Sequence, residues 1–249
     1  MKLDDVKKLH QKKYRSQFGF YLVEGEHLIL ELFKAQSTIA NFQQVTVYVT
    51  EANLDWANQL SGEFTLTVLN DKQMSQISDT KTPQGMIARV PLPGHQSAKP
   101  ADHGSTRYIY LHEVQDPGNL GTILRTLAWF GDFVLLLSAN SVDPYNSKVV
   151  RASMGAIFHL PIEVDVPLSD LRERFASFAY LDLNGESIHC ESFTQHECYL
   201  FGNEARGVPH DALKQFNATP FTINGAGAIE SLNLASAVSI CSFQLSQYG

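Results

Sequence analysis

The chain has little of what stabilises small secreted proteins or membrane proteins. Its 249 residues include three cysteines, Cys190, Cys198 and Cys241, a scattered odd number that is typical of a reducing compartment rather than of a disulfide framework. No apolar run approaches the roughly 20 residues that a membrane helix needs. The charged N-terminus has no apolar core behind it, unlike a secretory signal. These absences predict a soluble cytoplasmic protein.

Positive charge is also scarce, and it is unevenly distributed. The formal net charge of −7 argues against a protein that coats nucleic acid non-specifically. The first twenty residues nevertheless hold six basic residues against two acidic ones, a net +4, so the rest of the chain sums to −11. A basic arm on an acidic body indicates either contact with a polyanion at one place or a solvated amphipathic first helix.

A stretch rich in proline, glycine and small polar residues, 91–105, predicts an exposed linker between two domains. Residues 1–90 predict a small α/β domain, with strands at 20–23, 45–49 and 64–68 and helices around 28–33 and 54–60.

Residues 106–249 predict a second domain, in which apolar strands alternate with helices. The expected strands are 107–113, 133–138, 177–182, 198–202 and 219–223, and the expected helices are 117–130, 167–176, 209–216 and 232–247. Buried strands separated by helices favour a mainly parallel sheet with helices on both faces. Ligands of such sheets bind beyond the carboxyl ends of the strands, so we expect chemistry in the loops there.

The first of these loops leads into the helix at 117–130. Asp116 is a good N-cap residue, and Pro117 suits the first helical position. At 100° per residue one helix face is apolar and packs on the sheet, whereas Gly121, Arg125 and Trp129 fall on the opposite face. The glycine leaves room for a ligand beside Arg125, but a glycine turn with a surface arginine explains the same pattern.

The second loop, 202–208, places Glu204 between Gly202 and Gly207 directly after a strand. Glycines here suit a tight turn that lets a ligand touch the backbone. The alternative is an ordinary strand-to-helix loop in which Glu204 pairs with Arg206 or is solvated.

The third loop, 224–233, precedes the closing helix. Ser231 is expected to cap that helix, and Asn233, a poor helix former in its first turn, needs another partner. An apolar stripe at Leu234, Val238, Cys241 and Leu245, interleaved with small residues, indicates close packing in the core or across a dimer.

Together the three loops resemble the SpoU/TrmH branch of the SPOUT superfamily of RNA 2′-O-ribose methyltransferases. That family carries N-x-G-x-x-x-R, G-x-E-x-x-G and S-L-N motifs in this order. The matching residues here are Asn119, Gly121 and Arg125, then Gly202, Glu204 and Gly207, then Ser231, Leu232 and Asn233. Upstream, 23–25 and 78–85 are similar to the family's small, ribosomal-protein-like substrate-recognition domain.

The resemblance implies a fold and partners that composition would not suggest. It implies a C-terminal trefoil knot, a homodimer that completes each active site, and S-adenosyl-L-methionine bound in the knot. It also implies a structured RNA substrate, with ribosomal RNA favoured and transfer RNA possible. Two features depart from the family pattern: the acidic body, and the segment 224–227, where relatives more often have Pro-Met and a single glycine.

The resemblance also implies roles for individual residues. The expected cofactor contacts are Gly202, Ile223, Leu232 and, less directly, Leu181. The expected catalytic residues are Arg125, Asn119, Glu204, Ser231 and Asn233. A free guanidinium is a poor base, so our hypothesis is that Arg125 chiefly clamps phosphate and orients the ribose hydroxyl. The expected RNA contacts are Arg125 and the arm residues Lys12, Lys13 and Arg15.

Other functions have weaker support in the sequence. The spacing of His189, Cys190, His196 and Cys198 matches no zinc pattern, so no metal is expected. The aromatic residues of the arm, Tyr14, Phe18 and Phe20, suit either base stacking or attachment of the first helix to its domain. Two alternatives to the methyltransferase stay open. One is a catalytically silent RNA-binding relative, and the other is an unrelated nucleotide-binding α/β enzyme such as a dehydrogenase.

Overall fold

The computed structural model describes residues 1–94 and 106–247. The chain forms two compact units, and along its length it passes from one unit to the other more than once. The N-terminal unit comprises residues up to 95 together with 143–159, and the C-terminal unit comprises 96–142 and 160–249. The expected linker overlaps the end of a strand at Pro91, and its residues 95–105 lie outside the described residues. No helix of the described chain is long and apolar enough to cross a membrane.

The N-terminal unit is built on a four-stranded sheet in the order β1-β4-β2-β3. Its strands are β1 (Phe20–Glu24), β2 (Thr46–Thr50), β3 (Thr65–Leu69) and β4 (Met86–Pro91). Its α-helices are α1 (Leu3–Lys8), α2 (Lys12–Phe18), α3 (Glu26–Lys34), α4 (Leu54–Ala57), α5 (Asp71–Ile77) and α7 (Ser147–Ala152).

Strand β4, which pairs antiparallel with both β1 and β2, was not expected from the sequence. A charged residue, Arg89, interrupts its apolar run and obscures the pattern of a central strand. The structure accommodates this arginine, because its guanidinium lies 4.3 Å from the centre of the Phe20 ring and donates to Thr46 Oγ1 at 2.8 Å. Phe18 and Phe20 pack against the apolar core of this unit, which favours attachment of the helix over base stacking for these two rings.

Arg15 has a structural position that the sequence did not reveal. The residue is 3% exposed, and its guanidinium donates to the Leu9 carbonyl at 2.8 Å and to Asp143 Oδ2 at 2.9 Å. This corrects its expected role in RNA contact, because a buried and paired guanidinium is not available to a phosphate. Lys12 and Lys13 of the same helix are exposed.

Segment 143–159 explains how part of the second sequence domain joins the first unit. Asp143 pairs with Arg15, Tyr145 packs on Tyr21 with ring centres 5.0 Å apart, and Ser147 Oγ donates to Asp79 Oδ2 at 2.6 Å. Burial raises the pKa of both tyrosines well above the ordinary value. The segment is therefore held by buried contacts rather than carried as a loose loop.

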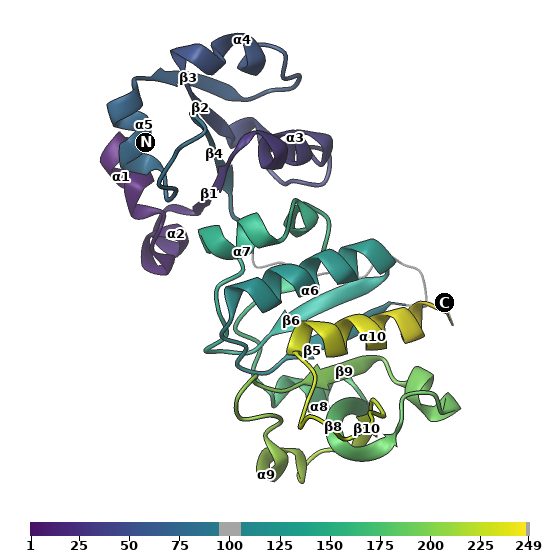
Figure 1. Cartoon of the computed structure of the whole chain (residues 1–249). Coiled ribbons are helices and arrows are strands. Elements are labelled where there is room, and N and C mark those ends of the chain that lie inside the picture. The colour runs from purple at the N-terminus through teal and green to yellow at the C-terminus, as the bar shows by residue number, and fades with distance from the viewer. Residues whose placement is uncertain (95–105, 248–249) are drawn as a thin grey trace. The chain divides into compact units, whose positions relative to one another are not determined.

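The C-terminal unit contains a six-stranded sheet in the order β10-β8-β9-β5-β6-β7, in which every described pairing is parallel (Figure 1). Its strands are β5 (Arg107–Leu111), β6 (Phe133–Leu137), β7 (Ile162–Glu163), β8 (Phe178–Ser187), β9 (Cys198–Phe201) and β10 (Ala218–Thr222). Its α-helices are α6 (Pro117–Phe130), α8 (Asp170–Arg174), α9 (His210–Leu213) and α10 (Leu234–Ser246). The two-residue strand β7 was not expected, because it is too short to show a pattern.

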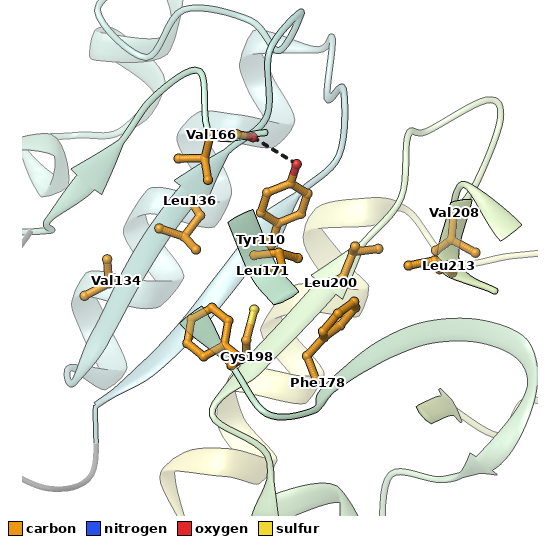
Figure 2. Packing of buried hydrophobic residues seen from close by; sticks show 11 residues of the cluster. Tyr110, Val134, Leu136, Val166, Leu171, Phe178, Cys198, Leu200, Val208 and Leu213 are labelled. Carbon is orange, nitrogen blue, oxygen red and sulfur yellow. Dashed lines mark hydrogen bonds between the residues drawn. The ribbon is translucent and has the colours of Figure 1, made fainter. Parts of the chain in front are cut away.

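Helices cover both faces of this sheet, as the sequence predicted. On one face, the side chains of β5, β6 and β9 pack with α8 and α9 around Tyr110, whose hydroxyl donates to the Val166 carbonyl at 3.0 Å (Figure 2). Because side chains alternate along a strand, Ile109 and Leu135 belong to the opposite face, the one that α6 is expected to cover. Helices α6 and α10 pack side by side, with a hydrogen bond of 2.9 Å between the Thr126 and Ser239 hydroxyls. The expected α/β fold is confirmed, and the knot stays a prediction.

Candidate active site

The three loops singled out in the sequence meet at one pocket in the C-terminal unit. The pocket has a volume of about 670 Å³ and lies at the carboxyl ends of β9 and β10, beside the middle of β8. Asn119 of α6, residues 201–208 after β9 and residues 230–234 before α10 all line it. Stretches of chain that are 85 to 114 positions apart therefore converge in space.

Glu204 connects the second loop to the first. Its carboxylate accepts hydrogen bonds from the backbone N–H groups of Gln115 and Asp116, both at 3.2 Å, and from Asn119 Nδ2 at 3.3 Å. The two backbone groups immediately precede α6, whose N-cap residue is Asp116. A negative charge is favoured at this end of a helix. No ion pair joins Glu204 to Arg206 among the described residues, because the Arg206 guanidinium pairs with Glu113 instead.

Asn233 connects the third loop to the first. Its Nδ2 donates to Asn119 Oδ1 at 2.9 Å, while its Oδ1 accepts from the N–H groups of Ala235 at 2.9 Å and Ser236 at 3.3 Å. Asn233 is therefore the N-cap of α10, and the expectation that Ser231 caps this helix is wrong. Ser231 lies exposed in the wall of the pocket. An asparagine is a poor helix former but a strong N-cap, which accounts for its place here.

Gly202 and Gly207 bring the second loop into a tight hairpin. Asn203 and Gly207 exchange two backbone hydrogen bonds, at 3.0 and 2.9 Å. A Cβ atom on Gly202 would lie 2.2 Å from the Gly207 carbonyl carbon, so no larger residue fits without moving the backbone. The loop thus presents backbone to the pocket, as the glycine pattern predicted.

A break in strand β8 forms the opposite wall. The register between β8 and β10 jumps from Tyr180–Pro220 to Glu186–Phe221, so residues 181–185 leave the ladder. Four of these five residues line the pocket, Leu181 among them. A bulge of this kind commonly redirects side chains beside functional sites.

All four expected cofactor contacts and four of the five expected catalytic residues line this pocket. The former are Leu181, Gly202, Ile223 and Leu232, and the latter are Asn119, Glu204, Ser231 and Asn233. Arg125 does not line it; it lies exposed on α6, on the same side of the helix as Trp129. Gly121, expected on that exposed face, is buried.

Several residues that shape the site were not recognised from the sequence. Asn203 accepts from the N–H groups of Ala205 and Arg206 at 3.0 Å and donates to the Glu113 carbonyl at 2.6 Å. Gln115 Nε2 donates to the Asn140 carbonyl at 2.6 Å. The preference of asparagine for its own backbone in turns could have indicated Asn203. The contacts of Gln115 depend on packing alone.

His112, at the end of β5, stays outside the pocket lining. Burial lowers the pKa of this imidazole below its ordinary value, although the neighbouring Glu113 carboxylate opposes the shift. In the described residues no group of three or more histidine, cysteine, aspartate or glutamate side chains is arranged to hold a metal ion.

Comparison with known proteins gives this arrangement a family. The model of the SpoU rRNA Methylase family matches residues 106–243, and that of the MRM3-like substrate binding domain matches residues 2–88. The chain belongs to the SpoU rRNA methylase family. The resemblance drawn from the three motifs is therefore confirmed, and so is the small α/β domain before them.

Members of this family and their relatives match the chain over nearly its whole length. The 23S rRNA (guanosine(2553)-2′-O)-methyltransferase RlmP of Bacillus subtilis is 27% identical, over 98% of this chain and 95% of its own. A TrmH-family structure from Porphyromonas gingivalis has a TM-score of 0.81 at 28% identity, covering 99% of this chain and 97% of its own. An AdoMet-bound rRNA methyltransferase structure from Sinorhizobium meliloti has a TM-score of 0.79 at 26% identity, covering 99% of this chain and 94% of its own.

Proposed function

We propose that the protein transfers a methyl group from S-adenosyl-L-methionine to a ribose 2′-hydroxyl of structured RNA, with ribosomal RNA as the favoured substrate. The observation that carries this proposal is the hydrogen-bonded chain Glu204–Asn119–Asn233, which joins all three motifs of the family at one pocket. A relative of matching length methylates a 2′-oxygen of 23S rRNA, as its name states. A substrate in ribosomal RNA agrees with a cytoplasmic location.

The residues present fit S-adenosyl-L-methionine. The pocket volume of about 670 Å³ lies in the range of small-molecule sites, about 300–1,000 Å³. Leu181, Ile223 and Leu232 supply apolar surface for a planar base, and the hairpin that the missing Cβ of Gly202 allows to close supplies the polar wall beside it. When bound, the cofactor supplies an activated methyl group with its own leaving group.

The protein's contribution is then to position the acceptor. Asn119 is held from both sides, by Glu204 on its amide nitrogen and by Asn233 on its amide oxygen. This arrangement fixes the start of α6, on which Arg125 follows less than two turns later. We assign Arg125 to the RNA: its planar guanidinium binds phosphate and orients the ribose hydroxyl, and preorganised orientation lowers the barrier.

We also propose a homodimer that completes the site through α6 and α10. Trp129 is 84% exposed, Phe243 is 53% exposed, and Ile240 lies on the same helix as Phe243 with 38% exposed. Phe130 and Phe243 lie 6.0 Å apart between ring centres, so the apolar surface is continuous across the two helices. Exposed apolar surface of this kind marks an interface. Arg125 precedes Trp129 by one turn, so a second copy docked here lies beside Arg125.

For RNA capture we assign Lys12 and Lys13 of α2. Both are exposed, and Lys13 lies 5.7 Å from the centre of the Tyr14 ring. Arg15 anchors this helix rather than binding RNA. Deleting the arm would also remove Val6 and Leu9, which are buried in the core of the unit, so single substitutions are the cleaner probe.

Methylation of total ribosomal RNA by the purified protein tests the proposal. Ribosomal RNA from a strain that lacks the gene is incubated with S-adenosyl-L-methionine, and nucleosides are analysed by mass spectrometry. We expect one new 2′-O-methylated nucleoside with the wild type and none with Arg125→Ala. A base-methylated product, or no product although S-adenosylhomocysteine binds, would contradict the assignment, the latter in favour of a silent RNA-binding relative.

A further inference from the structure

The pocket contains a carboxylate–imidazole pair that none of the three motifs includes. Asp182 lies in the β8 break, with its side chain 13% exposed, and its Oδ2 is 3.2 Å from Nε2 of His210, which is 62% exposed. Both residues line the pocket. Asp182 Oδ1 also accepts the N–H of Asn184 at 2.9 Å, which fixes the orientation of the carboxylate.

This pair differs from the other charged groups of the pocket wall in the described chain. The Glu204 carboxylate is occupied by the first loop, and the Arg206 guanidinium by Glu113. Glu230 is exposed in the loop before α10. In the described chain, Asp182 and His210 are the one carboxylate–imidazole pair whose members both line the pocket.

We infer that Asp182 and His210 bind the amino-acid end of S-adenosyl-L-methionine, an inference that rests on the proposed function. That end carries an ammonium and a carboxylate on one carbon, and the pair offers a carboxylate for the ammonium beside an imidazole N–H for the carboxylate, at a similar spacing. The ammonium pairs with Asp182, and the carboxylate accepts a hydrogen bond from the imidazole of His210. The shielded Asp182 carboxylate gains more from a cation than from the uncharged ribose hydroxyls, and the base has the apolar side chains Leu181, Ile223 and Leu232.

The exposure of the two side chains supports the same assignment. Asp182 is shielded from water, so its charge interacts strongly with a cation brought close to it. His210 lies at the rim, where a charged ligand end keeps part of its hydration. Asp182 and His210 are also partners of each other, so the Asp182 carboxylate has a polar partner in the pocket wall.

Two ligands that differ only in the amino-acid end distinguish recognition of that end from a purely structural contribution of Asp182 and His210 to the pocket wall. S-adenosylhomocysteine carries the ammonium and the carboxylate, and 5′-methylthioadenosine lacks both. Titration calorimetry on the full chain measures each Kd for the wild type, Asp182→Asn, His210→Gln and His210→Lys. Asp211→Asn and His189→Gln are matched controls, because both residues are exposed and neither lines the pocket.

We expect Asp182→Asn and His210→Gln to weaken S-adenosylhomocysteine about tenfold each and to leave 5′-methylthioadenosine within about twofold. His210→Lys places an N–H donor with a positive charge at the same position and should keep most of the affinity. Asparagine at 182 keeps the oxygen that accepts from Asn184, and thermal unfolding verifies that the variants are folded.

Equal weakening of both ligands, or no weakening of either, would overturn the inference while leaving the proposed function intact. A wild-type protein that binds neither ligand and does not methylate RNA would instead overturn both. The two failures are therefore distinguishable in one set of titrations.

Discussion

At the scale of the residue, the motif side chains that line the pocket also form hydrogen bonds with one another. Glu204 accepts three hydrogen bonds from the first loop, and Asn119 connects Glu204 to Asn233. These are positioning roles, since each side chain holds a backbone segment in place. Arg125 differs, because its guanidinium is exposed and outside the pocket wall. Its role is accordingly assigned to the RNA.

The Arg125→Lys substitution tests that assignment. Lysine keeps the charge but loses the planar fork that grips a phosphate and a hydroxyl together. We expect turnover of RNA to fall at least about a hundredfold, a change of about 3 kcal/mol in the barrier. The Kd for S-adenosylhomocysteine should change less than about threefold, because Arg125 does not line the pocket. Near-normal turnover in single-turnover assays would refute the role.

Asn233 has two functions that different substitutions separate. Asn233→Asp keeps the oxygen that caps α10 but removes the Nδ2 donor to Asn119. Asn233→Ala removes both. We expect urea unfolding to show a loss of about 1 kcal/mol for the alanine variant and little for the aspartate variant. Turnover should fall in both, and normal turnover in Asn233→Asp would contradict the positioning role of the Asn119 contact.

At the scale of the element, the pocket is made by two irregularities in otherwise regular strand-to-helix units. Residues 181–185 leave the β8–β10 ladder, and the loop after β9 closes into a hairpin between Asn203 and Gly207. The long helices α6 and α10 contribute their first turns, where unpaired N–H groups are capped by Asp116 and Asn233. The regular parts of these strands and helices form the hydrophobic core, and the residues at their ends line the pocket.

Gly202→Ala tests the hairpin. The new Cβ would meet the Gly207 backbone at 2.2 Å, so the loop must move. We expect a loss of about 1–3 kcal/mol in unfolding free energy and weaker S-adenosylhomocysteine binding by calorimetry. Gly225→Ala is the control, because a Cβ there meets nothing within 4 Å and should change neither quantity. Equal behaviour of the two variants would show that the close approach is unimportant.

At the scale of the whole molecule, sequence domains and structural units do not coincide. Segment 143–159 falls inside the matched methylase region but is packed in the N-terminal unit. Its ion pair with Arg15 fixes α2, the helix that carries the proposed RNA contacts Lys12 and Lys13. The position of the proposed RNA contacts therefore depends on residues that the chain encodes within its methylase region.

Trp129→Glu tests the proposed homodimer. A glutamate at position 129 would replace apolar surface of α6 and α10 that the proposed interface buries. It would also place an unpaired charge in that interface, which is unfavourable. Light scattering after size-exclusion chromatography should give a dimer for the wild type and a monomer for the variant, with RNA methylation lost. Val68→Glu changes an apolar residue that is 43% exposed elsewhere and should leave the dimer intact. A wild-type monomer would overturn this part of the proposal.

The stability of the protein should fall in acid. Burial lowers the pKa of both His112 and His196 below the ordinary 6.5, so the unfolded chain takes up these protons more readily than the folded one. The folded protein therefore has this stabilisation above about pH 6.5 and loses it as the pH falls through the lowered pKa values of the two histidines in the folded state. Urea unfolding at pH 7.5 and 5.5 measures this loss. His196→Gln should reduce it, the exposed His189→Gln should not, and identical pH dependence in both variants would contradict the cause.

The sequence by itself determined the alternating strands and helices of the C-terminal unit, the parallel sheet, the family and eight of the residues that line the pocket. Periodicity, glycine turns and short motifs are properties of neighbouring residues, so they can be recognised without a structure. Packing alone decided that Arg15 is buried against Asp143 and that Asp182 meets His210. Arg15 and Asp143 are 128 positions apart in the chain, and Asp182 and His210 are 28 positions apart. Which distant side chains meet depends on how the finished elements pack, and no local pattern encodes that.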